Sequence, residues 1–171
     1  MALLDDVMIF IKSELIAELR AQGHDNTGSL VNSMEVIVKA LGEDVVGEIY
    51  MNSYWAQLEY GIKAANIPYT RGSGAGKSDY ITGLMNYFIS KGLGSIQAKQ
   101  AAFATANVHK KYGYPSPNSY SSEFSSNNQR KGFMNRTIKK NMSYIKKYVA
   151  LEYQKDFKQA LDAMISRVQA A

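Results

Sequence analysis

The chain contains no cysteine, three prolines and one tryptophan among its 171 residues. Without cysteine, a protein has no disulfide scaffold, no thiol nucleophile and no cysteine-ligated zinc, which suits assembly in a reducing cytoplasm. Long hydrophobic runs are also missing. Near the amino terminus the longest run, residues 7–11, follows two aspartates. We therefore expect no signal peptide, no membrane span and no membrane partner, in a chain made in the cytoplasm.

The length and composition indicate one domain. At 171 residues, with 46% hydrophobic residues, the chain is long enough to bury a core without help from metals or disulfides. We predict a single domain over residues 1–171.

Basic residues are concentrated at the carboxyl end. Residues 129–171 contain ten Lys or Arg and three acids, whereas the first 128 residues contain ten and twelve. This bias has two interpretations. The basic end meets a polyanion, with DNA the obvious candidate, or it is the solvated face of a helix.

The amino-terminal part predicts a helix followed by a β-hairpin. Apolar residues recur at steps of three and four over residues 2–21, as in an amphipathic helix. A helical turn through Ser33 precedes two β-branched runs, at 35–41 and 45–51, with a tight turn at 42–44. Residues 54–60 fit either a helical turn or an extended segment, and we favour a short helix. The inward strand positions are predicted as Val36, Val38, Val46 and Ile49.

The carboxyl-terminal part predicts three helices and two loops. A flexible glycine loop at 71–78 precedes a helix from Ser78 to about Lys91, and a second helix begins at Ser95 and ends at Gly113. The last helix begins at Asn135 and has about 30 residues. It would span roughly 45 Å, more than a compact domain of this size needs, so part of it should pack on something outside its own core.

Residues 114–131 are too rich in Ser and Asn to form a core, and we predict an extended arm. Its aromatic residues, Tyr114, Tyr120 and Phe124, are candidate subunit contacts. The alternative is a mobile surface loop.

Two pairs of lysines stand seven residues apart in the last helix. This spacing places both pairs on roughly one side of the helix, away from its apolar line. The four are candidate contacts for DNA or a partner: Lys139, Lys140, Lys146 and Lys147.

The stretch from Arg71 to Ser78 differs from a phosphate-binding P-loop only at the first glycine, which here is Arg71. A P-loop follows a buried parallel strand, however, and the residues before this stretch are short and broken by Pro68. We therefore favour a glycine loop that meets another subunit or DNA over a nucleotide site.

No other catalytic pattern is present, and we predict no catalytic, metal or cofactor-binding residue. His24 and His109 lack metal-ligand spacing and are predicted to be surface residues. Glu59 is expected to accept hydrogen bonds from local backbone amides and not to act as a general base.

A short ordered set of motifs precedes and follows the predicted hairpin. Before it stands a Thr-Gly-x-Leu-x-x-Ser segment, and after it an aromatic segment that ends in Glu-x-Gly. This order resembles the neck and tail-completion proteins of tailed bacteriophages, over about half of the chain. The matching residues are Thr27, Gly28, Leu30, Ser33, Tyr54, Glu59 and Gly61. Trp55 and Ile62 depart from the family pattern, and Gly132-Phe133-Met134 loosely matches the opening of its last helix.

The resemblance implies a structural virion protein and not an enzyme. Such proteins form a homo-oligomeric ring in the neck, bound to portal or adaptor proteins on one side and to tail proteins on the other, with DNA in the lumen. Combined with the residue patterns, it predicts an α+β fold: an amino-terminal helix, a small antiparallel sheet and a helical carboxyl-terminal half. The alternatives are a basic DNA-binding accessory protein and, less favoured, a P-loop-like NTPase.

Overall fold

The structure, a computed structural model, describes residues 2–24, 27–42, 44–70, 72 and 78–169. It confirms the predicted α+β architecture, with a two-stranded antiparallel sheet and helices elsewhere. In chain order the elements are α1 (Ala2–Ala21), α2 (Ser29–Asn32), β1 (Glu35–Leu41), β2 (Asp44–Tyr50), α3 (Trp55–Tyr60), the 3-10 helix η1 (Ala64–Asn66), α4 (Asp79–Ser90), α5 (Ser95–Tyr112), the 3-10 helix η2 (Pro117–Tyr120) and α6 (Phe133–Gln169).

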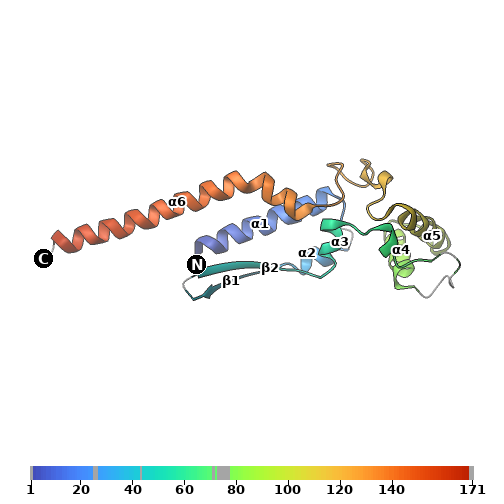
Figure 1. The fold of residues 1–171 in the computed structure, drawn as a ribbon, viewed down its shortest axis with the longest axis horizontal. Coiled ribbons are helices and arrows are strands. Elements are labelled where there is room, and N and C mark those ends of the chain that lie inside the picture. The colour runs from blue at the N-terminus through green and yellow to red at the C-terminus, as the bar shows by residue number, and fades with distance from the viewer. Residues whose placement is uncertain (1, 25–26, 43, 71, 73–77, 170–171) are drawn as a thin grey trace.

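Helix α1 lies between the hairpin and α6, so this half of the molecule has three layers (Figure 1). The antiparallel register pairs Val36 with Ile49 and Val38 with Gly47, which places these residues on one face of the sheet. That face meets α1 closely, because a Cβ added at Gly47 would lie 2.7 Å from Cγ of Met8. Glycine is therefore required where the sheet passes under the helix.

The prediction for Val46 is wrong. Val46 pairs with Lys39, so it belongs to the opposite face of the sheet from Val36, Val38 and Ile49. Side chains alternate between the two faces of a strand, so either of the consecutive valines, Val45 or Val46, could face α1 as judged from the sequence. The strand pairing decides which one does.

The main core joins α1, α2 and α3 to the first turn of α6. Phe133 is completely buried at the start of α6, and Ile49 and Met51 from the hairpin side pack against the same cluster. The buried members of the cluster are Leu15, Leu19, Leu30, Met34, Leu58 and Phe133.

A second core lies between α4 and α5, at the other end of the molecule (Figure 1). Ile81 of α4 packs against Ala102 and Ala106 of α5, with Phe103 partly buried beside them. The small side chains allow the two helices to pack closely. Helix α4 begins after Ser78, as predicted, but no side-chain hydrogen bond caps it. Thus the predicted single domain contains two clusters of buried residues.

Helices α1 and α6 run antiparallel and contact each other every four residues. Going back along α1 and forward along α6, the pairs are Glu18 with Arg136, Glu14 with Lys140, Phe10 with Tyr144 and Asp6 with Tyr148. A further step of four residues along each helix reaches the start of α1, at Ala2, and residue 152 of α6. Residues 153–169 of α6 therefore extend beyond the helix that supports it, over roughly 25 Å.

Candidate assembly surface and the groups that position it

The first family-like motif holds the chain against the main core on either side of the hairpin. Leu30 is buried in that core, and Gly28 takes a positive φ of 67° at the N-cap of α2. The hydroxyl of Ser33 donates to the carbonyl of Leu30 at 2.8 Å and accepts from the amide of Asn52 at 3.0 Å. Thr27 Oγ1 accepts from the amide of Ser29 at 3.3 Å. The motif thus fixes how the chain enters and leaves the hairpin.

The second motif positions α6. Glu59 accepts hydrogen bonds from the amides of Met134 at 2.8 Å and Asn135 at 3.3 Å, in the first turn of α6. A carboxylate is favourable there because the amides at a helix start lack partners and carry partial positive charge. Glu59 binds backbone amides as predicted, but the prediction that these amides are local is wrong, because its partners lie 75 and 76 residues away in the sequence. Tyr54 is the N-cap residue of α3 and packs against the main core.

Gly61 ends this motif where two segments of the chain touch. Its φ is 76°, and a Cβ there would lie 2.5 Å from the carbonyl oxygen of Tyr114. Next to it, Ile62 and Tyr114 exchange two backbone hydrogen bonds, at 2.7 and 2.8 Å. Any side chain at position 61 would separate these segments.

Residues 114–131 fold against their own subunit, where the sequence predicted an extended arm. Arg130 is buried, and its Nη1 donates to the carbonyls of Gln22 at 2.5 Å and Phe124 at 2.9 Å. The hydroxyl of Ser125 donates to the carbonyls of Ala21 and Gln129. A cation suits the end of α1, where carbonyls lack helical partners. The extended arm was predicted because the segment has few apolar residues to bury. Its hydrogen bonds to the end of α1 could not be predicted from composition.

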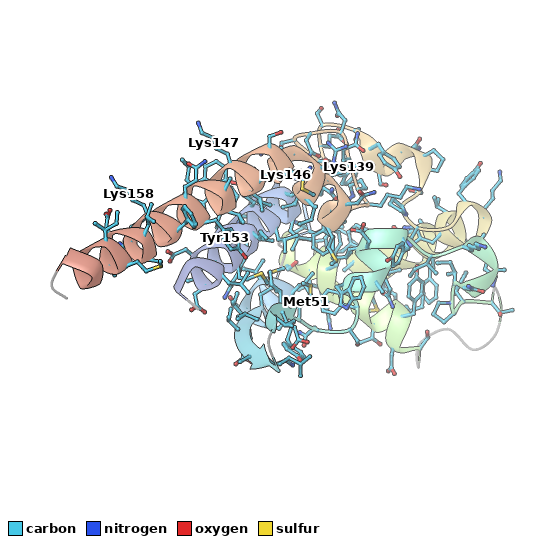
Figure 2. The ribbon with its side chains drawn as sticks, turned by 60° about the vertical axis from the view of Figure 1, so that its left-hand side comes forward. Met51, Lys139, Lys146, Lys147, Tyr153 and Lys158 are labelled. Atoms are coloured by element: carbon cyan, nitrogen blue, oxygen red, sulfur yellow. The ribbon has the colours of Figure 1, made fainter. Side chains whose placement is uncertain are left out.

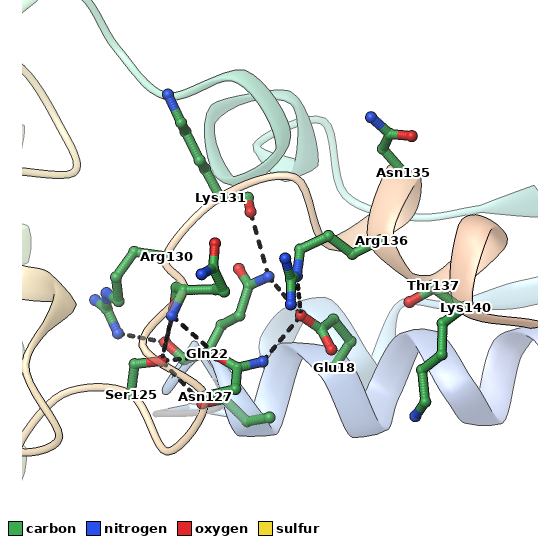
Figure 3. Close-up of polar contacts among 12 residues, drawn as sticks. Glu18, Gln22, Ser125, Asn127, Arg130, Lys131, Asn135, Arg136, Thr137 and Lys140 are labelled. Carbon is green, nitrogen blue, oxygen red and sulfur yellow. Dashed lines mark hydrogen bonds and ion pairs between the residues drawn. The ribbon is translucent and has the colours of Figure 1, made fainter.

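Glu18 is the centre of the attachment (Figure 3). Its Oε1 accepts from Gln22 Nε2 at 2.9 Å, from Asn127 Nδ2 at 3.0 Å and from Arg136 Nε at 3.0 Å. Partial burial by itself raises the pKa of Glu18, but these hydrogen bonds and the charge of Arg136 lower it more. One carboxylate therefore joins α1, the 114–131 loop and α6.

Both histidines were predicted to be surface residues, and both predictions are wrong. His109 is buried, with Nδ1 2.6 Å from the Tyr80 hydroxyl. His24 is partly buried, with Nε2 3.0 Å from the carbonyl of Arg130 and Nδ1 3.4 Å from the Tyr114 hydroxyl. The two imidazoles lie beside the ring of Tyr114, which joins the two halves of the molecule. The sequence gives no sign of this, because the three residues meet only in the fold.

The three candidate contacts in the loop therefore differ in accessibility. Tyr114 packs between the histidines and Tyr120 is partly buried, whereas Phe124 is exposed. Of the three, Phe124 is the most available to a neighbouring molecule.

The projecting part of α6 exposes a large amount of apolar surface. Every described side chain from Ala150 to Ser166 is exposed, including Phe157 at 70% and Met164 at 63%. A small cavity of about 200 Å³, lined partly by Phe10 and Tyr144, lies between α1 and α6 in the last turns before the projecting part. We call residues 153–169 the α6 tail. Its exposed apolar side chains are Tyr153, Phe157, Leu161, Met164 and Ile165.

The α6 tail presents these side chains away from its own subunit. At about 100° per residue, Phe157 and Leu161 lie on the side of α6 opposite Tyr148, which faces α1. Lys139, Lys146 and Lys147 lie on that outer side too, and all three are exposed. Figure 2 shows Lys147 and Lys158 pointing away from α1.

The four candidate lysines do not all face outward. Lys140 forms an ion pair with Glu14 of α1 at 3.3 Å, so the structure assigns it a contact within the subunit. Lys139, Lys146 and Lys147 form no ion pair with any residue that the structure describes. The outer side of α6 therefore combines three unpaired cations with the apolar tail.

The predicted glycine loop lies mostly outside the described residues, which include only Gly72 and Ser78 of it. The chain before it forms the 3-10 helix η1, and the carbonyl of Ile67 accepts from Lys110 Nζ at 3.1 Å. This segment is not the buried parallel strand that a P-loop follows.

None of the described helices has the length and hydropathy needed to cross a bilayer. In the same part of the chain, no three acidic or histidine side chains gather as metal ligands do.

The chain matches no protein-family model, no curated protein and no solved structure.

Proposed function

We propose that this protein is a structural subunit of a tailed-bacteriophage virion, which assembles into a ring at the neck between the portal and the tail. In this role it links portal or adaptor proteins to tail proteins and surrounds the DNA channel. The family-like motifs support this proposal, because the contacts of their residues are structural. Ser33 hydrogen-bonds to Leu30 at the core, Glu59 caps α6, and Gly61 allows two segments of the chain to touch.

The observation that carries the proposal is the α6 tail. Large apolar side chains such as Phe157 and Met164 are exposed along a helix that has left its own support. Monomeric proteins rarely expose contiguous apolar patches of this kind, and an amphipathic helix gains most of its stability from packing. A partner that covers the tail stabilises it.

The shape of the subunit favours a ring over a closed pair. The tail lies at one end of an elongated molecule and the α4–α5 unit at the other (Figure 1). When one patch meets a different patch on the next copy, the contact repeats, and it closes into a ring if the rotation allows.

Assembly of the purified full-length chain tests the proposal. Analytical ultracentrifugation should show one large species in equilibrium with subunits, and negative-stain electron microscopy should show rings with a central channel. Immunogold labelling of virions from the strain that carries the gene should mark the joint between head and tail. A chain that stays monomeric at every concentration, and is missing from virions, would contradict the proposal.

The exposed side chains of Lys139, Lys146 and Lys147 on α6 support DNA binding as a second candidate function. A monomer that binds duplex DNA with affinity falling steeply with salt, and that forms no rings, would favour a DNA-binding accessory protein.

A further inference from the structure

The hairpin has an uncovered outer face. The register places Glu35, Ile37, Lys39 and Leu41 of β1 on the side opposite α1. Ile37 is 36% exposed, Leu41 is 65% exposed, and Tyr50 across from Glu35 is 49% exposed. A two-stranded sheet is only marginally stable alone, and here α1 covers one side only.

The α6 tail of the same molecule cannot cover this face. Helix α1 lies between α6 and the hairpin, and the outer face points away from both helices (Figure 1). The tail likewise presents its apolar side away from α1. Each surface is therefore open only to another molecule.

The two surfaces match in length and in chemistry. Seven-residue strands span about 23 Å and the tail about 25 Å. Both carry large apolar side chains. The two strands contain three acids and one basic residue, Lys39, which is paired with Glu48 at 2.7 Å. The tail itself contains three basic residues and two acids, so the two surfaces carry net charges of opposite sign.

We propose that the α6 tail of one copy packs across the outer face of the hairpin of the next copy. The tail then becomes the second helix of a sheet covered on both sides, with Phe157, Leu161 and Met164 against Ile37 and Tyr50. This contact joins two different patches, so it repeats around a ring. The inference rests on the proposed function, for which it names the surfaces that meet.

The absence of cysteine makes a direct test possible. We would prepare Leu161→Cys and Ile37→Cys as separate full-length variants, both at exposed positions, and confirm their folds by circular dichroism. Each variant alone and the two mixed would then be oxidised and resolved on non-reducing gels. We expect a disulfide-linked dimer in the mixture and none with either variant alone, because the contact joins two different surfaces.

A second variant checks the contact without crosslinking. Leu161→Asp should weaken association by roughly a hundredfold, since it brings an unpaired charge into the buried patch. The matched control is Gln159→Asp, on the opposite, polar side of the same turn, which should assemble like the parent chain.

The outcomes separate this inference from the proposed function. Rings without the mixed crosslink would leave the ring proposal standing and overturn the tail–hairpin contact. Crosslinking of Leu161→Cys alone would overturn it in favour of pairing between two tails. A chain that is monomeric and gives no crosslink would overturn both.

Discussion

Single side chains at helix ends hold this subunit together. Glu59 binds the first amides of α6, and Arg130 binds the carbonyls of Gln22 and Gly23, which directly follow α1. Both place a charge where the helix dipole favours it, although neither belongs to the helix that it caps. The type of partner could be predicted for Glu59 from its chemistry. Its position could not, because 75 residues separate Glu59 from Met134.

His24 makes the stability of the subunit depend on pH. Burial, and then the charge of Arg130, lower the pKa of His24 to about 4 from 6.5. Because the folded-state pKa lies below that of the unfolded chain, the unfolded state binds the proton first as pH falls. The contribution of His24 is complete above pH 6.5 and is lost as the pH falls towards 4. Between pH 6.5 and 5 we expect a loss of about 1 to 2 kcal/mol in the free energy of unfolding.

Urea unfolding of the subunit at several pH values measures this loss. His24→Gln should make the curve flatter over that window. The matched variant, His109→Gln, should flatten it too, since burial lowers the pKa of His109 in the same direction. Equal slopes for all three chains would show that neither histidine is linked to folding.

At the scale of elements, the spacing of apolar residues predicted the helices well. The alternation of residues along the strands was a poorer guide to which side chains face α1. The spacing of apolar residues in α1 and α4 predicted both helices, since a buried stripe has to recur every three or four residues. The hairpin was found, but Val46 was assigned to the wrong face because neighbouring valines fit either phase. The 114–131 segment was misjudged, because hydrogen bonds from Ser125 and Asn127 to α1 hold it in the fold, and composition does not reveal such bonds.

The two faces of β1 provide an element-scale prediction. Val38→Asn places an amide on the face packed on α1 and should lower the free energy of unfolding by about 2 to 4 kcal/mol. Ile37→Asn, the adjacent residue on the outer face, should cost less than about 1 kcal/mol. Chemical denaturation of both variants, at concentrations where the chain is monomeric, checks the difference. Equal costs would mean that the sheet face has been assigned wrongly.

At the scale of the whole molecule, exposed apolar surface is concentrated in the projecting part of α6. The outer side of the supported part carries Lys139, Lys146 and Lys147, whereas the projecting part combines apolar side chains such as Phe157 with cations such as Lys158. The sequence predicted the excess length of this helix, but not where it would leave α1. That point is set by the pairing of the two helices, which begins at Glu18 and Arg136.

Replacing Lys139, Lys140, Lys146 and Lys147 by Gln tests the role of the cations. The fold should survive with a loss below about 1 kcal/mol, because the only ion pair removed among the described residues is the exposed Lys140–Glu14 pair. Binding to duplex DNA at low salt should weaken, and its salt dependence should become shallower. The matched control removes four lysines elsewhere: Lys63, Lys91, Lys99 and Lys111. If both variants change DNA binding equally, only net charge matters and α6 has no special role.

The backbone bridge between Ile62 and Tyr114 also has a consequence for engineering. The chain leaves the rest of the subunit after Ile62 and returns to it at Tyr114, and α4 and α5 lie between these two points. The ends of this excursion are held about 5 Å apart, which is the spacing of directly opposed residues in an antiparallel pair. We therefore expect the α4–α5 unit to be replaceable by another domain, with loss of the contact between His109 and Tyr114. A foreign domain with closely spaced termini, grafted between Ile62 and Tyr114, would be displayed at the end of the subunit opposite the α6 tail.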